Sequence, residues 1–140
     1  MRSAAADRAF ESLAPGERVS FEHTVSENDI AAFADLSGDY NPLHMDEGYA
    51  ASSTFGRRVL HGMFLGALVS RLVGMHLPGK SALLMKETLE FRKPVFIGDT
   101  VFVSGTLSHV SAATKILKIA IDIRRADEQV TLGEAHVQML

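Results

Sequence analysis

The hydrophobic pattern of the chain is dominated by one segment, from Gly62 to Leu77, in which nearly every residue is apolar. Only Ser70, Arg71 and His76 interrupt it. A surface helix has a single apolar stripe, so a helix that is apolar almost all round belongs inside a protein. The segment is too short to span a bilayer, and Pro78 ends it as it would end a helix of a soluble protein. We therefore expect a core helix that the rest of the chain encloses.

After this helix the pattern changes to a period of two, which predicts strands with one buried face. The alternation is clear in residues 88–92, 101–107 and 117–124. A last strand is expected from Val130 to Met139. Its apolar positions change parity around Gly133, which predicts a β-bulge there.

The region before the helix has its own local signals. Residues 18–25 alternate between apolar and polar and predict a first strand. Ser26 followed by Asp29 is typical of a capping box, and Gly38 is placed to end the helix that follows. A further short helix is expected from Asp46 to Ser52.

The N-terminal residues 1–16 are rich in alanine and end in a Pro-Gly pair, which predicts a loosely held arm or a short helix before the domain. Residues 17–140 are then expected to form one domain. Helices followed by several long antiparallel strands, with an apolar helix between them, indicate an α+β fold: a curved antiparallel sheet wrapped round one long central helix. Such a half-closed sheet has exposed edges, so we expect a homodimer.

Composition narrows the classes of function. With 140 residues, 46% of them hydrophobic, the chain can bury a core of ordinary size. A net charge of −3 and the lack of a basic block argue against nucleic acid or an anionic membrane as a partner. The absence of cysteine excludes disulfides, thiolate metal sites and a thiol nucleophile. No apolar leader is visible at the N-terminus, so cytoplasm is the default location.

The candidate chemistry lies between Asp39 and His44. On one helix these residues would point roughly 140° apart, but Pro42 pushes the chain out of the helical region before it. A bent loop lets the carboxylate and the imidazole reach the same water, as proton removal and return on adjacent atoms require. Asn41 is placed to hold the loop by bonding its own backbone. Taken singly, such an Asp is usually a turn residue and such a His is usually solvated.

The complete run is more specific than its members. Ser37-Gly38-Asp39-Tyr40-Asn41-Pro42-Leu43-His44, then Phe55 and His61-Gly62-Met63 opening the apolar helix, resembles the signature of MaoC-like dehydratases and (R)-specific enoyl-CoA hydratases. The resemblance extends from about the first strand to the C-terminus. It implies the hot-dog fold, a homodimer, and an acyl thioester of coenzyme A or acyl carrier protein as substrate. It implies no cofactor beyond the coenzyme A of the substrate.

The resemblance also implies roles for individual residues. Asp39 and His44 would be catalytic and hold the water that adds to a trans-2-enoyl thioester. In the substrate-binding group, Gly62 would offer its backbone N–H to the thioester oxygen, with Ser70 and Asn41 beside it. Ser70 would help to fix the Asp. One departure is Arg58, which stands where many members of the family have a proline.

Some alternatives stay open at this level. Ser70 is as well interpreted as a serine that bonds the carbonyl of Gly66 in its own helix. His61 is interpreted as a packing residue between loop and helix, and the histidines show no metal-ligand spacing, so no metal is expected. The leading function is (R)-specific hydration of enoyl-CoA. A hot-dog thioesterase and a non-catalytic subunit that binds acyl thioesters are the alternatives, and His44 favours hydration because hydrolysis places no proton on carbon.

Overall fold

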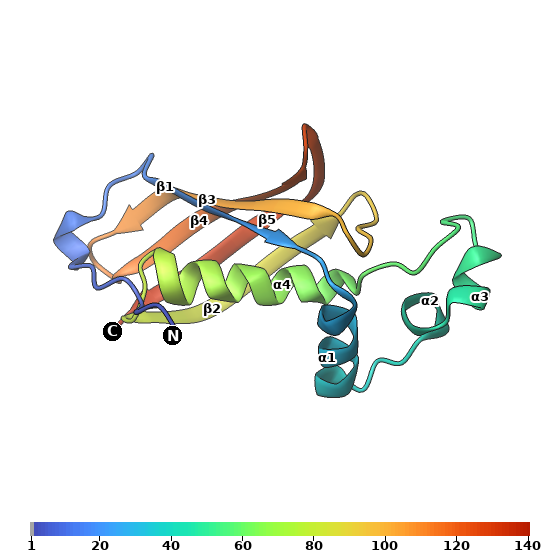
Figure 1. Ribbon diagram of the computed structural model, residues 1–140. Helices are drawn as coiled ribbons and strands as arrows, with labels where there is room; N and C mark the ends of the chain where they lie inside the picture. The colour runs from blue at the N-terminus through green and yellow to red at the C-terminus, as the bar shows by residue number, and fades with distance from the viewer. Residues whose placement is uncertain (1) are drawn as a thin grey trace.

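The computed structural model describes residues 2–140 (Figure 1). The helical elements are η1 (Phe10–Ser12), α1 (Glu27–Ser37), α2 (Pro42–Met45), α3 (Glu47–Ala51), α4 (Gly62–Arg71) and the π-helix η2 (Leu72–His76). The strands are β1 (Arg18–Thr24), β2 (Ala82–Phe91), β3 (Thr100–Ser111), β4 (Ile116–Arg125) and β5 (Glu128–Met139). Within residues 2–140 no helix is long and apolar enough to cross a membrane.

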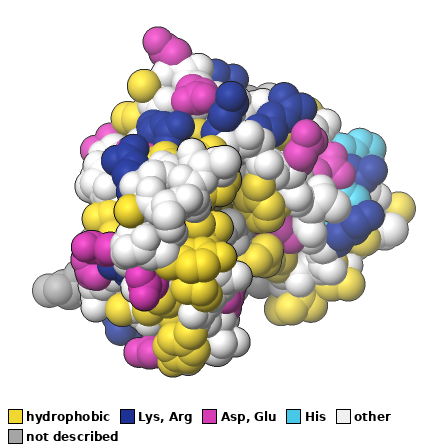
Figure 2. All heavy atoms as spheres, turned by 90° about the vertical axis from the view of Figure 1, so that its right-hand side faces the viewer, with side chains coloured by type: hydrophobic (Ala, Val, Ile, Leu, Met, Phe, Trp, Pro, Cys, Tyr) yellow, Lys and Arg dark blue, Asp and Glu magenta, His cyan; other side chains and the backbone are white. Residues whose placement is uncertain are grey.

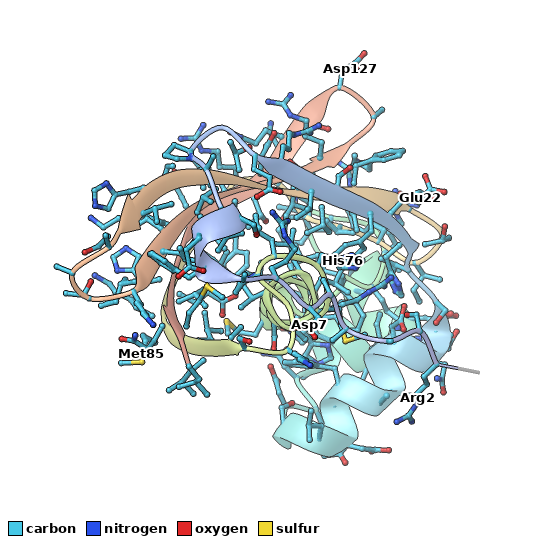
Figure 3. All side chains as sticks on the ribbon, turned by 90° about the vertical axis from the view of Figure 1, so that its left-hand side faces the viewer. Arg2, Asp7, Glu22, His76, Met85 and Asp127 are labelled. Atoms are coloured by element: carbon cyan, nitrogen blue, oxygen red, sulfur yellow. The ribbon has the colours of Figure 1, made fainter. Side chains whose placement is uncertain are left out.

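The five strands form one antiparallel sheet in the order β1-β3-β4-β5-β2. Viewed along α4, the sheet curves over the helix (Figure 3). Helices α1 to α3 project beyond one end of the sheet, and both chain termini lie at the other end (Figure 1). The expected α+β hot-dog architecture, with a central helix against a curved antiparallel sheet, is confirmed.

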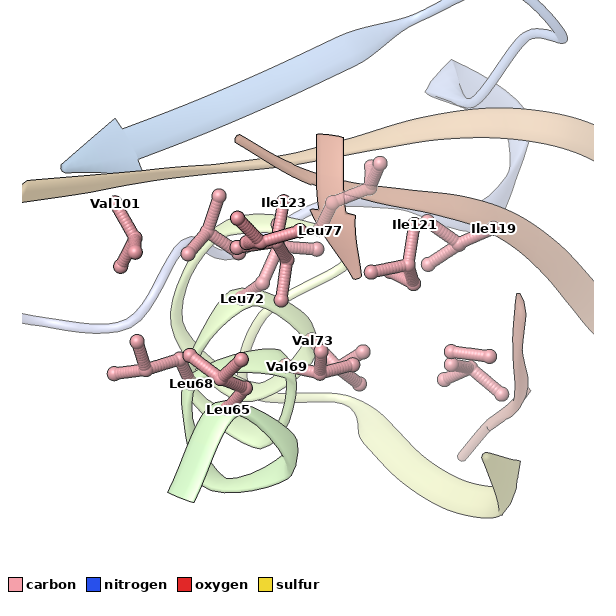
Figure 4. Packing of buried hydrophobic residues seen from close by; sticks show 14 of the residues in the cluster. Leu65, Leu68, Val69, Leu72, Val73, Leu77, Val101, Ile119, Ile121 and Ile123 are labelled. Carbon is pink, nitrogen blue, oxygen red and sulfur yellow. The ribbon is translucent and has the colours of Figure 1, made fainter. Parts of the chain in front are cut away.

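The core lies between α4 and the concave face of the sheet (Figure 4). Side chains spaced three and four residues apart on α4 and η2 meet alternate residues of the strands, and none of these is more than 3% exposed: Leu65, Val69, Leu72, Val73, Val101, Ile119, Ile121 and Ile123. Burying each such side chain contributes about 1.5–3 kcal/mol to folding. The predicted strand alternation therefore locates the core correctly.

One face of α4 is not covered. Met63, Ala67 and Ser70 recur at intervals of four and three residues, so they share one side of the helix. All three are exposed, Met63 to 55%. The expectation that one chain encloses the helix on every side is therefore wrong, because the sheet covers only the opposite side.

The N-terminal arm contains the short helix η1, which is one of the two forms expected for it, and it is not loosely held. The Ala6 N–H donates to the Met75 carbonyl, and the Lys80 N–H donates to the Ala6 carbonyl, both at 2.9 Å. Leu13 is only 7% exposed and joins the core. Backbone hydrogen bonds and one apolar side chain therefore fix the arm at the far end of the helix from α1.

The predicted bulge at Gly133 is also wrong. Gly133 pairs in register with Leu89 on one side and Ile121 on the other. The irregularity lies at Val130, which the β4–β5 pairing skips between Thr131 and Gln129. Glycine is required at 133 for another reason: a Cβ there would overlap the carbonyl oxygen of Thr88.

The local signals before α4 are confirmed with one correction. Ser26 and Asp29 form a capping box at the start of α1, and Gly38 ends the helix in the left-handed region with φ 77°. The run after Asp39 is not a plain loop, because α2 begins at Pro42. Proline suits the first position of a helix, where its missing N–H has no intrahelical partner anyway.

Candidate active site

Asp39 and His44 converge, as expected. Asp39 follows the glycine that ends α1, and His44 lies in α2, so one turn of chain brings them face to face. The Asp39 Oδ2 atom lies 3.8 Å from His44 Nε2. This separation is too long for a direct hydrogen bond. It suits a water molecule that bridges the two side chains.

The orientation of the His44 ring fixes which nitrogen faces the carboxylate. His44 Nδ1 lies 2.7 Å from the carbonyl oxygen of Val59. A carbonyl only accepts hydrogen bonds, so Nδ1 carries a hydrogen and donates it. In the neutral imidazole, Nε2 then presents its lone pair toward Asp39. Any proton that His44 exchanges with a ligand must pass through Nε2.

His61 contacts both Asp39 and His44. It is 2% exposed, its Nε2 donates to the backbone carbonyl of Asp39 at 2.9 Å, and its ring stacks on that of His44 with centroids 4.0 Å apart. Its Nδ1 has no hydrogen-bond partner within the part of the chain described. The interpretation of His61 as a packing residue is therefore incomplete, because the ring also holds the backbone of Asp39.

Asp39, His44 and His61 each bring one potential metal-ligand atom within 4.8 Å of the others. The two imidazole planes are stacked and inclined by only 28°. A histidine lone pair lies in the plane of its ring, so two nearly parallel stacked rings direct their lone pairs side by side. Zinc ligands instead converge on one point at about 2.0 Å. This geometry suits a bridging water better than a metal ion.

Gly62 begins α4 next to this pair. No side chain of residues 2–140 caps the helix, so the first backbone N–H groups of α4 lack the partner that a cap would supply. Two cavities of about 400 and 380 Å³ share His44, Gly62 and Phe91 in their walls. The first extends past Leu43, Phe55, Val59 and Pro94, and the second past Phe33, Asp39 and Met63. On the side where α1 to α3 project, hydrophobic side chains gather at the surface (Figure 2).

A family described as MaoC like domain matches residues 10–128. That match spans most of the chain. The chain belongs to the MaoC-like family.

Two curated relatives match this MaoC-like chain over most of their own length. It is 37% identical over 130 residues to the (R)-specific enoyl-CoA hydratase of Rhodospirillum rubrum, covering 93% of this chain and 90% of the relative. It is 36% identical over 130 residues to the 3-hydroxybutyryl-CoA dehydratase of Methylorubrum extorquens, covering 93% and 83%. Among solved structures, the (R)-hydratase of A. caviae superposes with a TM-score of 0.90 at 34% identity, covering 93% of this chain and 99% of that one.

Asn41 holds the turn of this MaoC-like site. Its side chain caps α2 by accepting from the Leu43 N–H at 2.9 Å, as the turn chemistry predicts. Its own N–H donates to Asp39 Oδ1 at 3.1 Å, which leaves Oδ2 free to face His44. Asn41 lines neither cavity. Asn41 therefore holds the turn, and its expected substrate contact stays a prediction.

Ser70 does not lie near Asp39 and His44, the catalytic dyad that the sequence predicts, within one chain. It lies eight residues after Gly62, roughly 12 Å along α4. Its hydroxyl bonds neither Asp39 nor the Gly66 carbonyl in the described structure, so neither of the two expected contacts is present. The side chain is exposed on the uncovered face of the helix.

Phe91 is a site residue, although the period-two pattern of residues 88–92 predicts only a strand with one buried face there. The alternation of β2 correctly places it on the same side as Leu89. Because it ends the strand, however, it extends past the core, remains 47% exposed and lines both cavities. A Cβ built on Gly62 would lie 3.2 Å from the Phe91 ring, so ring and helix start are in close contact.

Glu87 is an unexpected carboxyl group beneath the MaoC-like core helix. It lies on β2, and its Oε2 would be 3.4 Å from a Cβ built on Gly66. Its Oε1 is buried without a hydrogen-bond partner among residues 2–140. Burial raises the pKa of Glu87 above its ordinary value.

Proposed function

We propose that this MaoC-like protein is an (R)-specific enoyl-CoA hydratase, which adds water reversibly to trans-2-enoyl-CoA and gives (R)-3-hydroxyacyl-CoA. The observation that carries the proposal is the Asp39–His44 pair, 3.8 Å apart beside the uncapped start of α4. The names of the relatives in R. rubrum and M. extorquens support a CoA thioester as substrate and water as the group exchanged.

In this reaction the pair formed by Asp39 and His44 enters with one proton, so one member is the base and the other is the acid. The base accepts a hydrogen bond from the bridging water and takes a proton from it as the water oxygen bonds the β-carbon, and the electron pair of the double bond moves toward the thioester carbonyl. The acid delivers its own proton to the α-carbon, so the pair again holds one proton, the one taken from the water. A positioned acid or base of this kind contributes about 10²- to 10⁴-fold to the rate. The two side chains act as a coupled pair.

The negative charge that develops on the thioester oxygen needs a donor. The Gly62 N–H, at the positive end of the α4 dipole, is the proposed donor. Losing one such donor costs about 3–4 kcal/mol of transition-state stabilisation. Hydration exchanges protons without net oxidation or reduction, so these residues and the substrate supply the chemistry of the reaction. We propose that no further cofactor takes part.

The test is to mix the purified protein with crotonyl-CoA and follow the enoyl ultraviolet absorbance together with free thiol. Loss of absorbance without thiol, and a product of R configuration, is the expected result. Release of thiol would instead indicate a thioesterase, and acyl-CoA binding without turnover would indicate a binding subunit. Repeating the assay with crotonyl-acyl carrier protein shows which carrier gives the larger kcat/KM.

We also propose that the protein is a homodimer. The uncovered face of α4 lies beside β2, a free sheet edge on which Leu83 is 48% and Met85 59% exposed. Met85 projects outward at that edge (Figure 3). Apolar side chains and unpaired strand edges favour isologous pairing with a second copy. Sedimentation of the wild type at twice the mass of the chain, and of Met85→Lys at the single mass, is the expected outcome.

A further inference from the structure

Arg58 occupies an unusual position in the structure. It is only 8% exposed, although arginine is seldom buried without a partner. Its Nε donates to the backbone carbonyl of His44 at 2.6 Å, and its Nη1 donates to Glu27 Oε1 at 2.6 Å. The side chain therefore joins the first residue of α1 to the turn that carries His44.

The bond to the His44 carbonyl fills a gap in α2. A helix of four residues leaves its last carbonyls without intrahelical donors. The Leu43 carbonyl accepts from the Val59 N–H at 3.2 Å, and the next carbonyl, that of His44, accepts from Arg58. The His44 ring itself donates to the Val59 carbonyl. Arg58 and Val59 together therefore hold His44 by its main chain and by its side chain.

The ion pair with Glu27 makes this buried guanidinium tolerable. A buried charge is costly unless it is paired and hydrogen-bonded. Glu27 supplies the opposite charge, and its side chain is 70% exposed at the start of α1. We call the Arg58 side chain, with its bonds to Glu27 and to the His44 carbonyl, the clamp. Hydrogen bonds with a charged partner are roughly twice as strong as neutral ones, so the clamp holds the His44 carbonyl firmly.

We propose that Arg58 is a positioning residue of the hydration reaction, which holds the His44 imidazole opposite Asp39 through the His44 carbonyl, with Glu27 as its counter-ion. The inference rests on the proposed function for its kinetic test. The position of the His44 ring can be tested without any activity. A misplacement of a catalytic group by about 1 Å can cost about 100-fold in rate.

Two uncharged variants isolate the hydrogen bond. In Arg58→Gln the side-chain nitrogen occupies the chain position of the arginine Nε and still donates to the His44 carbonyl. In Arg58→Met a methyl group occupies that position and donates nothing. Both variants lose the ion pair with Glu27, so any loss of stability from that cause is the same in both and does not affect the comparison between them. We expect kcat on crotonyl-CoA to fall about 10- to 100-fold in Arg58→Met with little change in KM, and to stay near wild type in Arg58→Gln.

Arg8→Met is the matched control. Arg8 Nη1 lies 2.6 Å from Glu17 Oε1, the same pair of atoms at the same distance, but in the N-terminal arm at the other end of the molecule (Figure 1). This variant should keep the kcat of the wild type. Equal kcat in Arg58→Met and Arg58→Gln would overturn the positioning role.

A spectroscopic readout separates this inference from the proposed function. In protein labelled with ¹⁵N-histidine, the Nδ1–H signal of His44, assigned by its loss in His44→Gln, should move in Arg58→Met and stay in Arg58→Gln. This result is expected even if the wild type hydrates no enoyl-CoA. If neither Arg58 variant folds, Glu27→Gln decides: a moved His44 signal supports the clamp, and a signal identical to that of the wild type overturns it.

Discussion

Two regions of the molecule differ in how their side chains are buried and bonded. One is the sheet with α4, and the other is the projecting segment from α1 to the start of α4. In the first region, apolar residues at regular intervals are almost completely buried, and strands pair along most of their length. In the second, Asp39 and Asn41 are exposed, and polar atoms bond partners a few residues away. Stability therefore resides mainly in the first region and the candidate chemistry in the second. The two regions are joined by contacts such as Ile30 of α1, which packs in the core, and the Leu60 N–H, which donates to the Val95 carbonyl.

The largest effect is expected when the proton chemistry of the Asp39–His44 dyad is removed, which tests whether the chemistry lies in the second region. Asp39→Asn and His44→Gln keep size and lose the proton chemistry, so each should lower kcat for crotonyl-CoA by about 10²- to 10⁴-fold. Neither residue belongs to the core, so the unfolding midpoint in urea should stay close to that of the wild type. A folded Asp39→Asn variant with wild-type kcat would remove Asp39 from the mechanism.

The converse change is made in the core. Leu72 is fully buried, and Leu72→Ala leaves a cavity between the helix and β3. The free energy of unfolding should fall by about 2–5 kcal/mol, measured by urea denaturation. At temperatures where the variant is folded, its kcat should match that of the wild type. A large loss of kcat in the folded variant would show that the two regions are not separable.

Gly62 lies where the two regions meet. Gly62→Ala keeps the backbone N–H, but its Cβ would come within 3.2 Å of the Phe91 ring. The ring must shift by a few tenths of an ångström, so we expect kcat/KM to fall about tenfold. Phe91→Leu in the same chain should restore most of it. If the double variant is no better than Gly62→Ala, the contact with Phe91 is not the cause.

The smallest expected effect concerns Glu87 and pH. Because burial raises its pKa, the folded protein holds this proton more tightly than the unfolded chain does. The resulting stabilisation is complete below the ordinary carboxyl pKa and is lost as the pH rises through the raised value. Glu87→Gln should therefore raise Tm relative to the wild type in mildly alkaline buffer and leave it unchanged in acid. A gain of equal size at both pH values would contradict this origin.

The sequence predicts best what depends on neighbours in the chain. The capping box at Ser26, the glycine end of α1 and the alternation of β4 are local signals, and all are present. The convergence of Asp39 and His44 follows from one turn of chain, so it is predictable too.

What the sequence does not reveal depends on approaches between distant segments. Arg58 bonds a carbonyl fourteen residues away, and Gly133 is dictated by the neighbouring strand at Thr88. The open face of α4 was missed for another reason. An apolar residue has the same character in the sequence whether the fold buries or exposes it, so Met63 and Ala67 look like interior residues.

The placement of the chain ends has a practical consequence. Both termini lie at the end of the sheet opposite α1 to α3 (Figure 1), and the last residue is anchored there because the Leu140 N–H donates to the Ser81 carbonyl. An affinity tag, a fluorophore or an immobilising linker attached at either end therefore stands a full sheet length from the dyad. In protein tethered to a surface, the cavities beside Asp39 and His44 should stay open to the solution. One immobilised sample can then be used repeatedly across a panel of thioesters.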